Sequence, residues 1–486
     1  LGSLPCEGKR IAVLADMKEL GPDTVKFHQE VGTFLKEHPV DQVVLYGKLA
    51  EEIGVGLKMS GGNIPLAEVE NLEELEKWLD DHVVSGAYES IRMVVPTLCL
   101  LMAIGVMIGT WLQSGTIATI IVWGLQMINP AWLLPLTLIF CSVLSLVTGT
   151  SYGSVGSAGV AMMAIGNAMG INPGMVAGAV ICGAMFGDKL SPLSDTTNLA
   201  PAVAGSKLND HVRSMLWTTL PTFVISLVLF VILGISQTSG NYETGNLLTY
   251  IDALQGEFKL GFITLLPAIA IIILLLCKVN AVVSLGLSAI CAGAVSFFYQ
   301  GATLQSIIRV AYNGYSTSIE EGILQTILNR GGMSSMLQYV AIICFAVGMG
   351  GMLDRLGVLG NLLNAIVNHI NSDGSLIAAS LLVGYVTSLI SCSQPMSHVL
   401  TGNMMKPLFK SRKIAPEILS RTLEDAGTLS GPMIPWHGYC VYMSGTLGVA
   451  WSVFFPYLFL LYLTPLFSIF YGFTGISIRH TDNAQN

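Results

Sequence analysis

Charged side chains are scarce in this sequence, and the few that occur are unevenly distributed. Only 11% of the 486 residues are Asp, Glu, Lys or Arg, whereas soluble domains usually carry about 25%. Residues 1–86 hold 8 Lys/Arg and 16 Asp/Glu, and residues 87–486 hold 15 of each. The formal net charge of −8 therefore lies in the first 86 residues. This split excludes a single homogeneous soluble domain and a basic nucleic-acid-binding protein.

Two common functional patterns are also missing. The nine cysteines include no C-x-x-C pair and no framework spacing, which argues against a zinc site or a disulfide scaffold. No G-x-x-x-x-G-K-[ST] motif occurs, so the sequence lacks the phosphate-binding loop of an ATP-driven pump. The chain begins with Leu and without a signal-peptide pattern, and we expect a fragment or a fusion.

The first 86 residues alternate between short apolar runs and helical patterns. The runs at 8–17 and 41–47 predict strands, and the spacing over 24–37 predicts a helix. A third segment of mixed polar and apolar residues lies around 64–69. Asn71 is a suitable N-cap for a strongly acidic helix over 72–82. This alternation indicates a small α/β module, which we expect to be soluble, to lie at the cytoplasmic face and to be separate from residues 87–486.

The remaining 400 residues consist mainly of long apolar segments. No charged residue occurs from Met93 to Gly187, a run of 95 residues, and a helix spans a bilayer with about 20 residues. Spans are expected near 93–112, 116–128, 132–148, 155–169, 174–187, 215–235, 261–278, 280–299, 336–353, 374–392 and 451–472, with a broken one around 426–447. Four glycines, at 174, 178, 183 and 187, have the spacing that lets helices pack closely.

Several expected spans are interrupted by Gly, Pro and polar residues. Non-helical backbone at membrane depth is tolerated only where it is buried in protein or lines a wet cavity. The interrupted spans therefore indicate the functional centre. The first such segment is GDKLSPLSDTTNLAPAVAG at 187–205, and the second is RTLEDAGTLSGPMIPWHGYC at 421–440.

Each of these segments places an Asp, then hydroxyl side chains, then a Pro at the end of a broken apolar stretch. A Ser/Thr/Gly-rich break precedes each one, TGTSYGSVGS at 148–157 and SCSQPMSHVLTG at 391–402. The two sets are offset by roughly 240 residues, a weak internal symmetry typical of inverted-repeat secondary transporters. We therefore predict an all-α polytopic membrane protein with inverted repeats and broken helices, preceded by the small α/β module, and expect 187–198 and 425–437 to meet near its centre.

Two family resemblances add to these expectations. The segment IAVLADMKELGPDTVKFHQEVG, followed by VVLYG, resembles the C-terminal domain of MurF-type peptidoglycan ligases over residues 1–86. Residues 86–473, above all 187–205, resemble the NhaC family of sodium/proton antiporters, which includes malate/lactate antiporters. The resemblance implies a multi-pass protein of the bacterial inner membrane. In one respect the sequence departs from the family: it lacks the family's first helices, and the α/β module stands in their place. Family members more often carry Asn at the position of His437, which leaves the substrate open.

The chemistry of the two broken segments defines the candidate site. Hard cations such as sodium prefer carboxylate, hydroxyl and carbonyl oxygens, and a buried carboxylate can hold either a proton or a cation. Asp188 and Asp195 are the predicted sodium ligands, and the alternative for Asp188 is that it pairs with Lys189 or caps a helix. The full set of predicted ion- or substrate-binding residues is Thr150, Ser151, Asp188, Ser191, Ser194, Asp195, Thr196, Asn198, Asp425, Thr428, Ser430 and His437. Asp425, Thr428 and His437 are also candidates for an organic-acid contact.

Three functions follow from different parts of this evidence. Sodium/proton antiport accounts for the broken spans and their acidic residues, and sodium-coupled exchange of organic acids such as malate or lactate is its alternative. A non-functional hybrid with a ligase remnant is the third. We expect no enzymatic activity, no cofactor and no nucleic-acid partner. The expected partners are sodium, protons and the lipid bilayer, together with a small carboxylate if the protein exchanges organic acids. The sequence does not decide whether the protein forms a homo-oligomer.

Less prominent ionisable residues are expected to have structural roles. Asp210, His211 and Arg213 are expected at the membrane interface, and Glu320, Glu321 and Arg330 in a solvated connection. His398 could equally line the second broken segment or be a hydrogen-bonded core residue.

Overall fold

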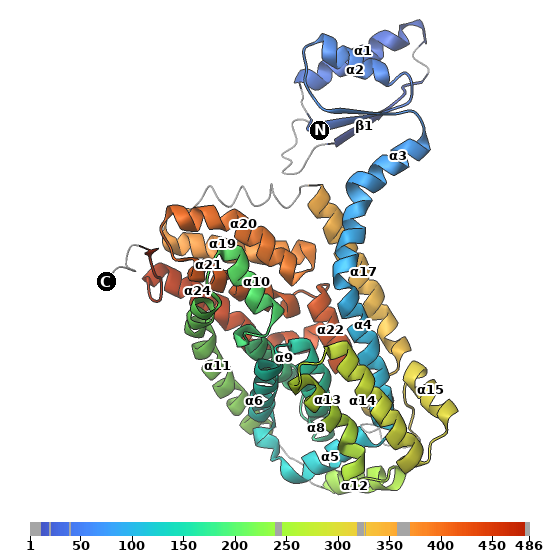
Figure 1. The fold of residues 1–486 in the computed structure, drawn as a ribbon, viewed down its shortest axis with the longest axis vertical. Helices are drawn as coiled ribbons and strands as arrows, with labels where there is room; N and C mark the ends of the chain where they lie inside the picture. Colours follow the sequence, from blue (N-terminus) through green and yellow to red (C-terminus); the bar gives the residue numbers. More distant parts are fainter. Residues whose placement is uncertain are drawn as a thin grey trace. The chain divides into compact units, whose positions relative to one another are not determined.

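The computed structural model describes residues 11–18, 21–37, 40–238, 245–317, 325, 327–356 and 370–481. The chain separates into two compact units, one formed by residues 1–93 and 347–369 and the other by residues 94–346 and 370–486. The first unit contains the α/β module, and the second, here called the membrane unit, contains most of the apolar helices (Figure 1).

The α/β module has a sheet of three parallel strands in the order β1 (Ile11–Ala15), β2 (Gln42–Tyr46) and β3 (Leu66–Val69). Helices α1 (Thr24–Glu37) and α2 (Glu51–Met59) connect the strands and pack against each other. Asn71 caps α3 (Leu72–Leu79) by accepting a hydrogen bond from the Glu74 backbone N–H at 2.9 Å. The predicted strands, the first helix and the cap are confirmed.

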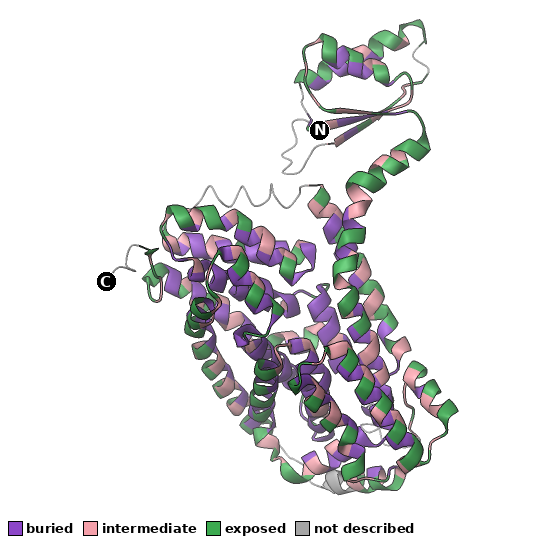
Figure 2. Ribbon diagram, viewed as in Figure 1, coloured by how far each residue is buried: buried purple, intermediate pink, exposed green. Residues whose placement is uncertain are grey.

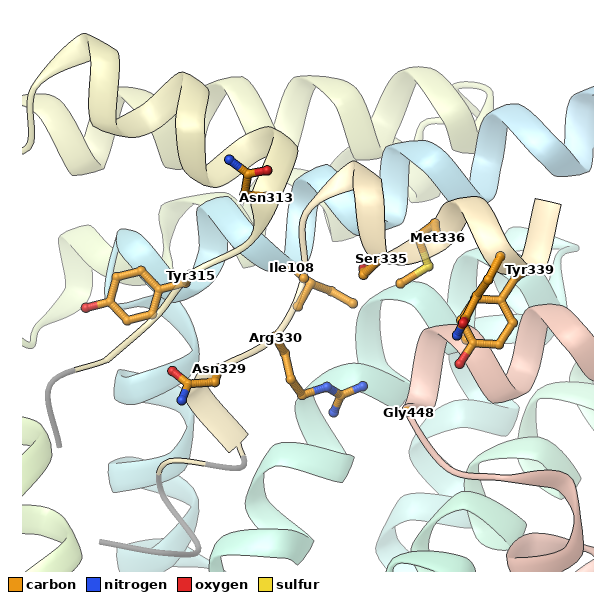
Figure 3. A pocket seen from close by; sticks show the side chains of 12 residues that line it. Ile108, Asn313, Tyr315, Asn329, Arg330, Ser335, Met336, Tyr339 and Gly448 are labelled. Carbon is orange, nitrogen blue, oxygen red and sulfur yellow. The ribbon is translucent and has the colours of Figure 1, made fainter. Parts of the chain in front are cut away.

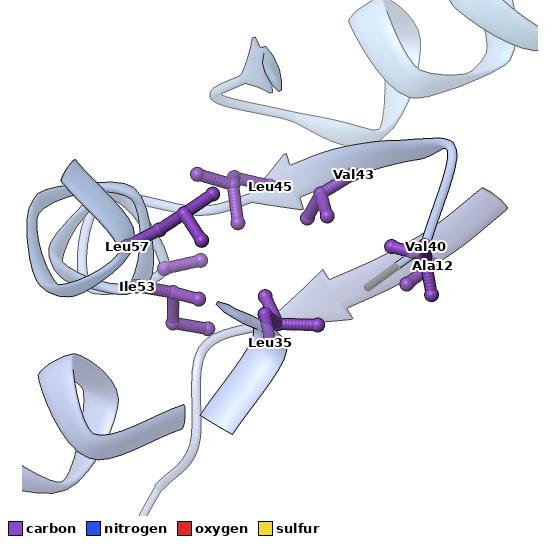
Figure 4. Packing of buried hydrophobic residues seen from close by; sticks show 8 residues of the cluster. Ala12, Leu35, Val40, Val43, Leu45, Ile53 and Leu57 are labelled. Atoms are coloured by element: carbon purple, nitrogen blue, oxygen red, sulfur yellow. The ribbon is translucent and has the colours of Figure 1, made fainter. Parts of the chain in front are cut away.

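Buried aliphatic side chains hold this small sheet to its two helices. Val43 and Leu45 of β2 lie against Ile53 and Leu57 of α2, with Leu35 of α1 completing the cluster (Figure 4). The sequence did not predict α2, because two glycines, Gly54 and Gly56, and Lys58 interrupt its apolar spacing. The burial of Ile53 and Leu57 stabilises the helix in spite of its weak intrinsic propensity.

Helices account for most of the described chain that follows the module (Figure 1). The longer ones are α4 (Ser85–Gln113), α5 (Thr116–Met127), α6 (Pro130–Thr148), α9 (Pro173–Leu190), α11 (Leu208–Thr238), α12 (Gly245–Glu257), α13 (Leu266–Leu276), α14 (Ala281–Val295), α17 (Leu337–Arg355), α19 (Asp373–Ser391), α20 (Gln394–Ser411) and α24 (Phe459–Thr474). The shorter ones are α7 (Ser151–Ser154), α8 (Val160–Ala168), α10 (Asp195–Ala204), α15 (Leu304–Asn313), α21 (Pro416–Leu423), α22 (Gly438–Leu447) and α23 (Trp451–Phe454).

Six helices in the described part of the chain are long and apolar enough to cross a membrane, and there are nine if each sharply bent pair counts as one span. One of these pairs is α9 with α10, which bends by 49° after Leu190. The prediction of an all-α polytopic membrane protein preceded by a small α/β module is confirmed. Helices α12, α15 and α20 were not predicted as spans, because polar residues interrupt their apolar runs.

The two breaks predicted upstream of the polar segments have the same local geometry. Helix α6 ends at Gly149 and α19 ends at Cys392, and both residues are left-handed, with φ of 71° and 54°. Each is followed by an extended residue, Thr150 or Ser393, that begins the next helix. The internal symmetry of the sequence thus has a counterpart in the order of the elements. The inverted orientation of the two repeats stays a prediction.

Helix α9 is the most enclosed long helix of the membrane unit, whereas α11 exposes much of its surface (Figure 2). A Cβ added at Gly183 would lie 2.4 Å from the Leu138 carbonyl oxygen of α6, and one at Gly187 would lie 2.3 Å from that of Ser142. Gly174 and Gly178 approach residues 453 and 457 just as closely. The packing role predicted for the four glycines is confirmed.

Gly183→Ala should therefore destabilise the protein although alanine favours helices. Overpacking costs about 1–3 kcal/mol, which outweighs a propensity gain of about 1 kcal/mol. Gly286→Ala in α14 is the matched control, because a Cβ there meets no atom within 4 Å. Thermal unfolding in detergent should give a lower Tm for Gly183→Ala and an unchanged or higher Tm for Gly286→Ala. Equal values would contradict the close packing of α6 and α9.

Candidate ion-binding site

Asp188 lies near the end of α9 and joins three separate segments of the membrane unit. The Ser151 hydroxyl, at the start of α7, donates a hydrogen bond to Asp188 Oδ2. The Tyr439 hydroxyl, from α22, donates to the same oxygen at 3.3 Å and contacts Ser151 directly. The break at 149–150 places Ser151 next to α9. Two predicted site residues, Asp188 and Ser151, therefore contact each other, and Tyr439, which was not predicted, joins them.

A buried ion pair connects the two predicted polar segments. Lys189 of α9 donates to Asp425 Oδ1, and both side chains are fully buried, with 0% exposure. Thr218 of α11 donates to the same oxygen at 3.2 Å. Asp425 Oδ2 is buried without a hydrogen-bond partner among the described residues. The segments around Asp188 and Asp425 therefore meet, as expected from the sequence.

A π-helical turn, Glu424–Thr428, carries the second carboxylate of this segment. The Thr428 hydroxyl donates to Glu424 Oε2 at 2.6 Å and lies 3.2 Å from His398 Nε2 of α20. Gln394 supports the turn by donating to the Thr428 carbonyl oxygen at 2.8 Å. Glu424 Oε1 is buried and has no hydrogen-bond partner in the described part of the chain. His398 thus contacts the broken segment, which was one of its two predicted roles.

These acidic and basic side chains form one electrostatic group. Glu424 interacts electrostatically with Asp188, Lys189 and Asp425. Arg421, one helical turn before Asp425, is also fully buried and donates to the Ser477 hydroxyl at 2.9 Å. Arg421 interacts with Asp425 and with Glu417, and Glu417 also pairs with Arg479. Apart from that pair, the three buried carboxylates of Asp188, Glu424 and Asp425 share the two buried cationic side chains of Lys189 and Arg421. A buried charge without compensation is costly, so this arrangement favours the uptake of one further positive charge.

The other predicted residues differ in their relation to this group. Ser191, Ser194 and Thr196 are buried, and the hydroxyls of Ser194 and Thr196 lie 3.1 Å apart. Asp195 and Asn198 are exposed: Asp195 starts α10, and Asn198 donates to the backbone oxygens of residues 192 and 194. The assignment of Asp195 as a sodium ligand stays a prediction. Its position at a helix N-terminus, where negative charge is favourable, is a sufficient structural role.

Three predicted residues mainly stabilise the breaks. Thr150 is half-buried and caps α7 by accepting from the Gly153 N–H at 3.4 Å. Ser430 donates to the Ser388 hydroxyl at 2.8 Å. His437 is buried, and its Nδ1 accepts from the Tyr439 N–H at 3.0 Å, which caps α22. His437 Nε2 has no partner among the described residues.

Several expectations about charged residues need correction. Lys189 pairs with Asp425, so the alternative that it pairs with Asp188 is wrong. His211 is fully buried rather than interfacial, and its Nδ1 lies 2.6 Å from the Ser420 hydroxyl. Arg330 lies in a connection between helices, as expected, and is half-buried there, where it lines a cavity. Asp210 and Arg213 are exposed, and Glu320 and Glu321 lie outside the described residues.

The sequence reasoning missed Lys189, Thr218, Glu424 and Tyr439 as parts of the site. Lys189 and Glu424 each adjoin a predicted Asp, and a charged residue inside a broken apolar segment was the available signal. Nothing in the sequence distinguishes Thr218 from the other hydroxyl residues of α11. No group of three His, Cys, Asp or Glu side chains suited to a metal ion occurs among the described residues, so any sodium site here would also use hydroxyl or carbonyl oxygens.

Broken membrane helices that meet at buried, partly compensated carboxylates define a class of protein, the secondary transporters. The comparison with known families identifies the family within this class. The sequence model of the Na+/H+ antiporter family matches residues 77–197 and 181–476, and the chain belongs to this family. The predicted resemblance to NhaC proteins is confirmed. The match begins at residue 77, so the resemblance of the preceding segment to MurF-type ligases stays a prediction.

Three curated relatives have similar identities but different stated activities. The Na(+)/H(+) antiporter NhaC of Alkalihalophilus pseudofirmus is 36% identical over 83% of this chain and 87% of its own length. The malate-2H(+)/Na(+)-lactate antiporter of Bacillus subtilis is 35% identical over 84% and 86%. The arginine/ornithine antiporter ArcD of Halobacterium salinarum is 34% identical over 84% of each chain.

Lys189→Met should strongly destabilise the protein, because it leaves the Asp425 carboxylate buried without its partner. Breaking a buried ion pair in this way costs about 3–5 kcal/mol. The double variant Lys189→Met/Asp425→Leu removes both charges and should recover much of the lost stability. Lys207→Met is the control, because it removes the charge of an exposed lysine. Thermal unfolding in detergent checks the order of the Tm values. A double variant no more stable than Lys189→Met would contradict this role of the pair.

Proposed function

We propose that the membrane unit exchanges sodium ions for protons across the bacterial inner membrane. Two unpartnered oxygens, Glu424 Oε1 and Asp425 Oδ2, support this proposal most directly. Both are buried carboxylate oxygens in a group that carries one more carboxylate than cationic side chains. Carboxylate oxygens are suitable ligands for sodium and equally suitable acceptors for a proton. One proton or one sodium ion balances the charge, and this competition provides the coupling.

Each residue has a distinct role in the proposed exchange. Asp188 is the carboxylate that alternates between proton and sodium, and Ser151 and Tyr439 hold it in place through its Oδ2. Lys189 keeps Asp425 ionised and oriented, with Thr218 on the same oxygen. Hydroxyl and backbone oxygens at the two breaks supply further ligands, because broken helices expose carbonyl groups that an intact helix would use internally.

The relatives support this function and leave its substrate range open. Sodium and proton appear in the names of the NhaC proteins and of the malate/lactate antiporter. The exchange needs no cofactor and no ATP, because the ion gradients supply the free energy. Coupled transport of a small organic acid is the second candidate, and it would require a separate positively charged contact for the carboxylate.

Asp188→Asn should abolish sodium-dependent proton movement, because the amide keeps the shape of the side chain but cannot exchange a proton for a cation. Vesicles that contain the purified chain, under an imposed sodium gradient and without ATP, provide the assay, with a pH-sensitive dye as the readout. We expect a loss of at least about 10-fold, equal to a 1.4 kcal/mol change. Asp252→Asn, at an exposed aspartate of the membrane unit, is the control for expression and insertion.

The same assay distinguishes the two predicted sodium ligands. Asp195→Asn should reduce exchange as strongly as Asp188→Asn if both residues coordinate the ion. Undiminished exchange in Asp188→Asn, with an unchanged dependence on sodium, would overturn the competition at this residue.

The pH dependence of sodium affinity gives an independent test of the proposed competition. If one proton and one sodium ion compete for the same carboxylate, protons raise the apparent KM for sodium by mass action. The increase should approach about tenfold for each pH unit once the carboxylate is mostly protonated. Initial rates at several sodium concentrations between pH 6 and pH 9 measure it. An apparent KM that is constant over this range would contradict the competition even if exchange itself occurs.

A further inference from the structure

A polar cavity lies elsewhere in the membrane unit, and its charge is opposite to that of the ion site. It has a volume of about 330 Å³ and contains a single charged side chain, Arg330, among its described lining residues. Amides and hydroxyls make up the rest of its polar wall, contributed by Asn313, Tyr315, Asn329, Ser335, Gln338 and Tyr339. In Figure 3 the guanidinium of Arg330 extends toward Gly448, with Tyr339 on the far side of the cavity.

The backbone around Arg330 is held firmly in place. Gly331 and Gly332 both have a φ of 82°, a conformation that other residues rarely adopt. The Gly332 N–H donates to the Gly105 carbonyl oxygen of α4 at 2.7 Å, and the Tyr315 N–H donates to the Arg330 carbonyl oxygen at 3.1 Å. A Cβ at Gly331 would lie 2.4 Å from the Gly109 nitrogen. The two glycines therefore allow the segment to pack closely against α4, which fixes the position of the Arg330 backbone.

The guanidinium of Arg330 has no carboxylate partner in the described part of the chain. Arg412 and Arg479, by contrast, pair with Asp373 and Glu417. The carboxylate of Glu257 is occupied by hydroxyl groups, those of Tyr315 at 2.7 Å and Thr317 at 2.5 Å. Instead, the guanidinium lies against a glycine: a Cβ at Gly448 would come within 1.9 Å of Arg330 Nη2. Among the described residues, a cation in a polar cavity without an acidic partner suits an anionic ligand.

We propose that this cavity binds the carboxylate of a small organic acid. The planar guanidinium can donate two parallel hydrogen bonds to one carboxylate, which a spherical anion such as chloride cannot accept. The neighbouring amides and hydroxyls can bind hydroxyl or second carboxyl groups of the ligand. The volume lies at the lower end of the range for small-molecule pockets, which suits an acid of a few carbon atoms.

Electrostatics separates this site from the ion site. An organic anion at Asp425 would face Glu424 and Asp188, and Lys189 there is already paired. Arg330 supplies a positive contact apart from Asp188, Glu424 and Asp425, among described lining residues that include no carboxylate. The inference does not require sodium/proton exchange, because it concerns binding to different residues.

Calorimetric titration of the full chain in detergent with L-malate and with L-lactate, at fixed sodium chloride, tests the proposal. Arg330→Gln should weaken binding at least 10-fold, and Arg330→Lys should weaken it less, because a lysine keeps the charge but not the planar fork. Arg309→Gln is the matched control, since Arg309 is an exposed arginine on α15. Thermal unfolding verifies that each variant is folded.

The outcomes are distinct from those of the exchange assay. Equal malate or lactate affinity in the wild type and Arg330→Gln would overturn the proposal, and so would the absence of binding to a wild-type protein that unfolds cooperatively. Sodium/proton exchange without any organic acid should persist in Arg330→Gln. Loss of exchange in Asp188→Asn together with intact malate binding would leave the two sites independent, as proposed.

Discussion

The ion pair between Lys189 and Asp425 is the interaction on which the centre of the membrane unit depends. It joins the end of α9 to the π-helical turn after α21, two segments that are 236 residues apart in the sequence. Removing two charges from water is costly, and only their mutual attraction and additional hydrogen bonds offset that cost. The pair therefore requires that the two broken segments meet, and this contact places Asp188, Glu424 and Asp425 in one electrostatic group.

The breaks in the helices meet a second requirement of the same region. A helix that stops inside a membrane leaves carbonyl and N–H groups that lipid cannot satisfy. Thr150 and His437 each accept a backbone N–H at the start of the next helix, and Gln394 donates to a carbonyl oxygen of the π-helical turn. The polar residues at the breaks thus stabilise the fold and also provide oxygen atoms near the carboxylates. Both the stability of the broken helices and the binding of an ion require polar oxygen atoms at the breaks, which explains why Ser and Thr are concentrated at these positions.

The sequence predicted the elements of this protein better than their contacts. Long apolar runs and the cap at Asn71 identify helices through local physics, and these predictions are confirmed. Asp188 and Asp425 stood out because charge is rare in the membrane unit, yet their partners could not be derived. Lys189 follows Asp188 in the chain, but consecutive residues on a helix point in different directions. Its contact with Asp425, like the contact of Tyr439 with Asp188, depends on tertiary packing. Helix α20 escaped prediction for a related reason, since its buried face carries polar residues such as Ser397, His398 and Thr401.

The two sites have opposite charge, which bears on how relatives with this fold can differ in their substrates. The relatives named for sodium/proton, malate/lactate and arginine/ornithine exchange are 36%, 35% and 34% identical to this chain, so overall similarity does not distinguish their substrates. The carboxylate-rich centre has an excess of negative charge and favours cations, while the cavity at Arg330 favours anions. Arg330 lies on a segment anchored by Gly331 and Gly332 against α4, and the residues that line its cavity do not include Lys189 or Asp425. If the cavity binds an organic acid as proposed, a change at Arg330 alters the binding of that acid and leaves Lys189 and Asp425 in place.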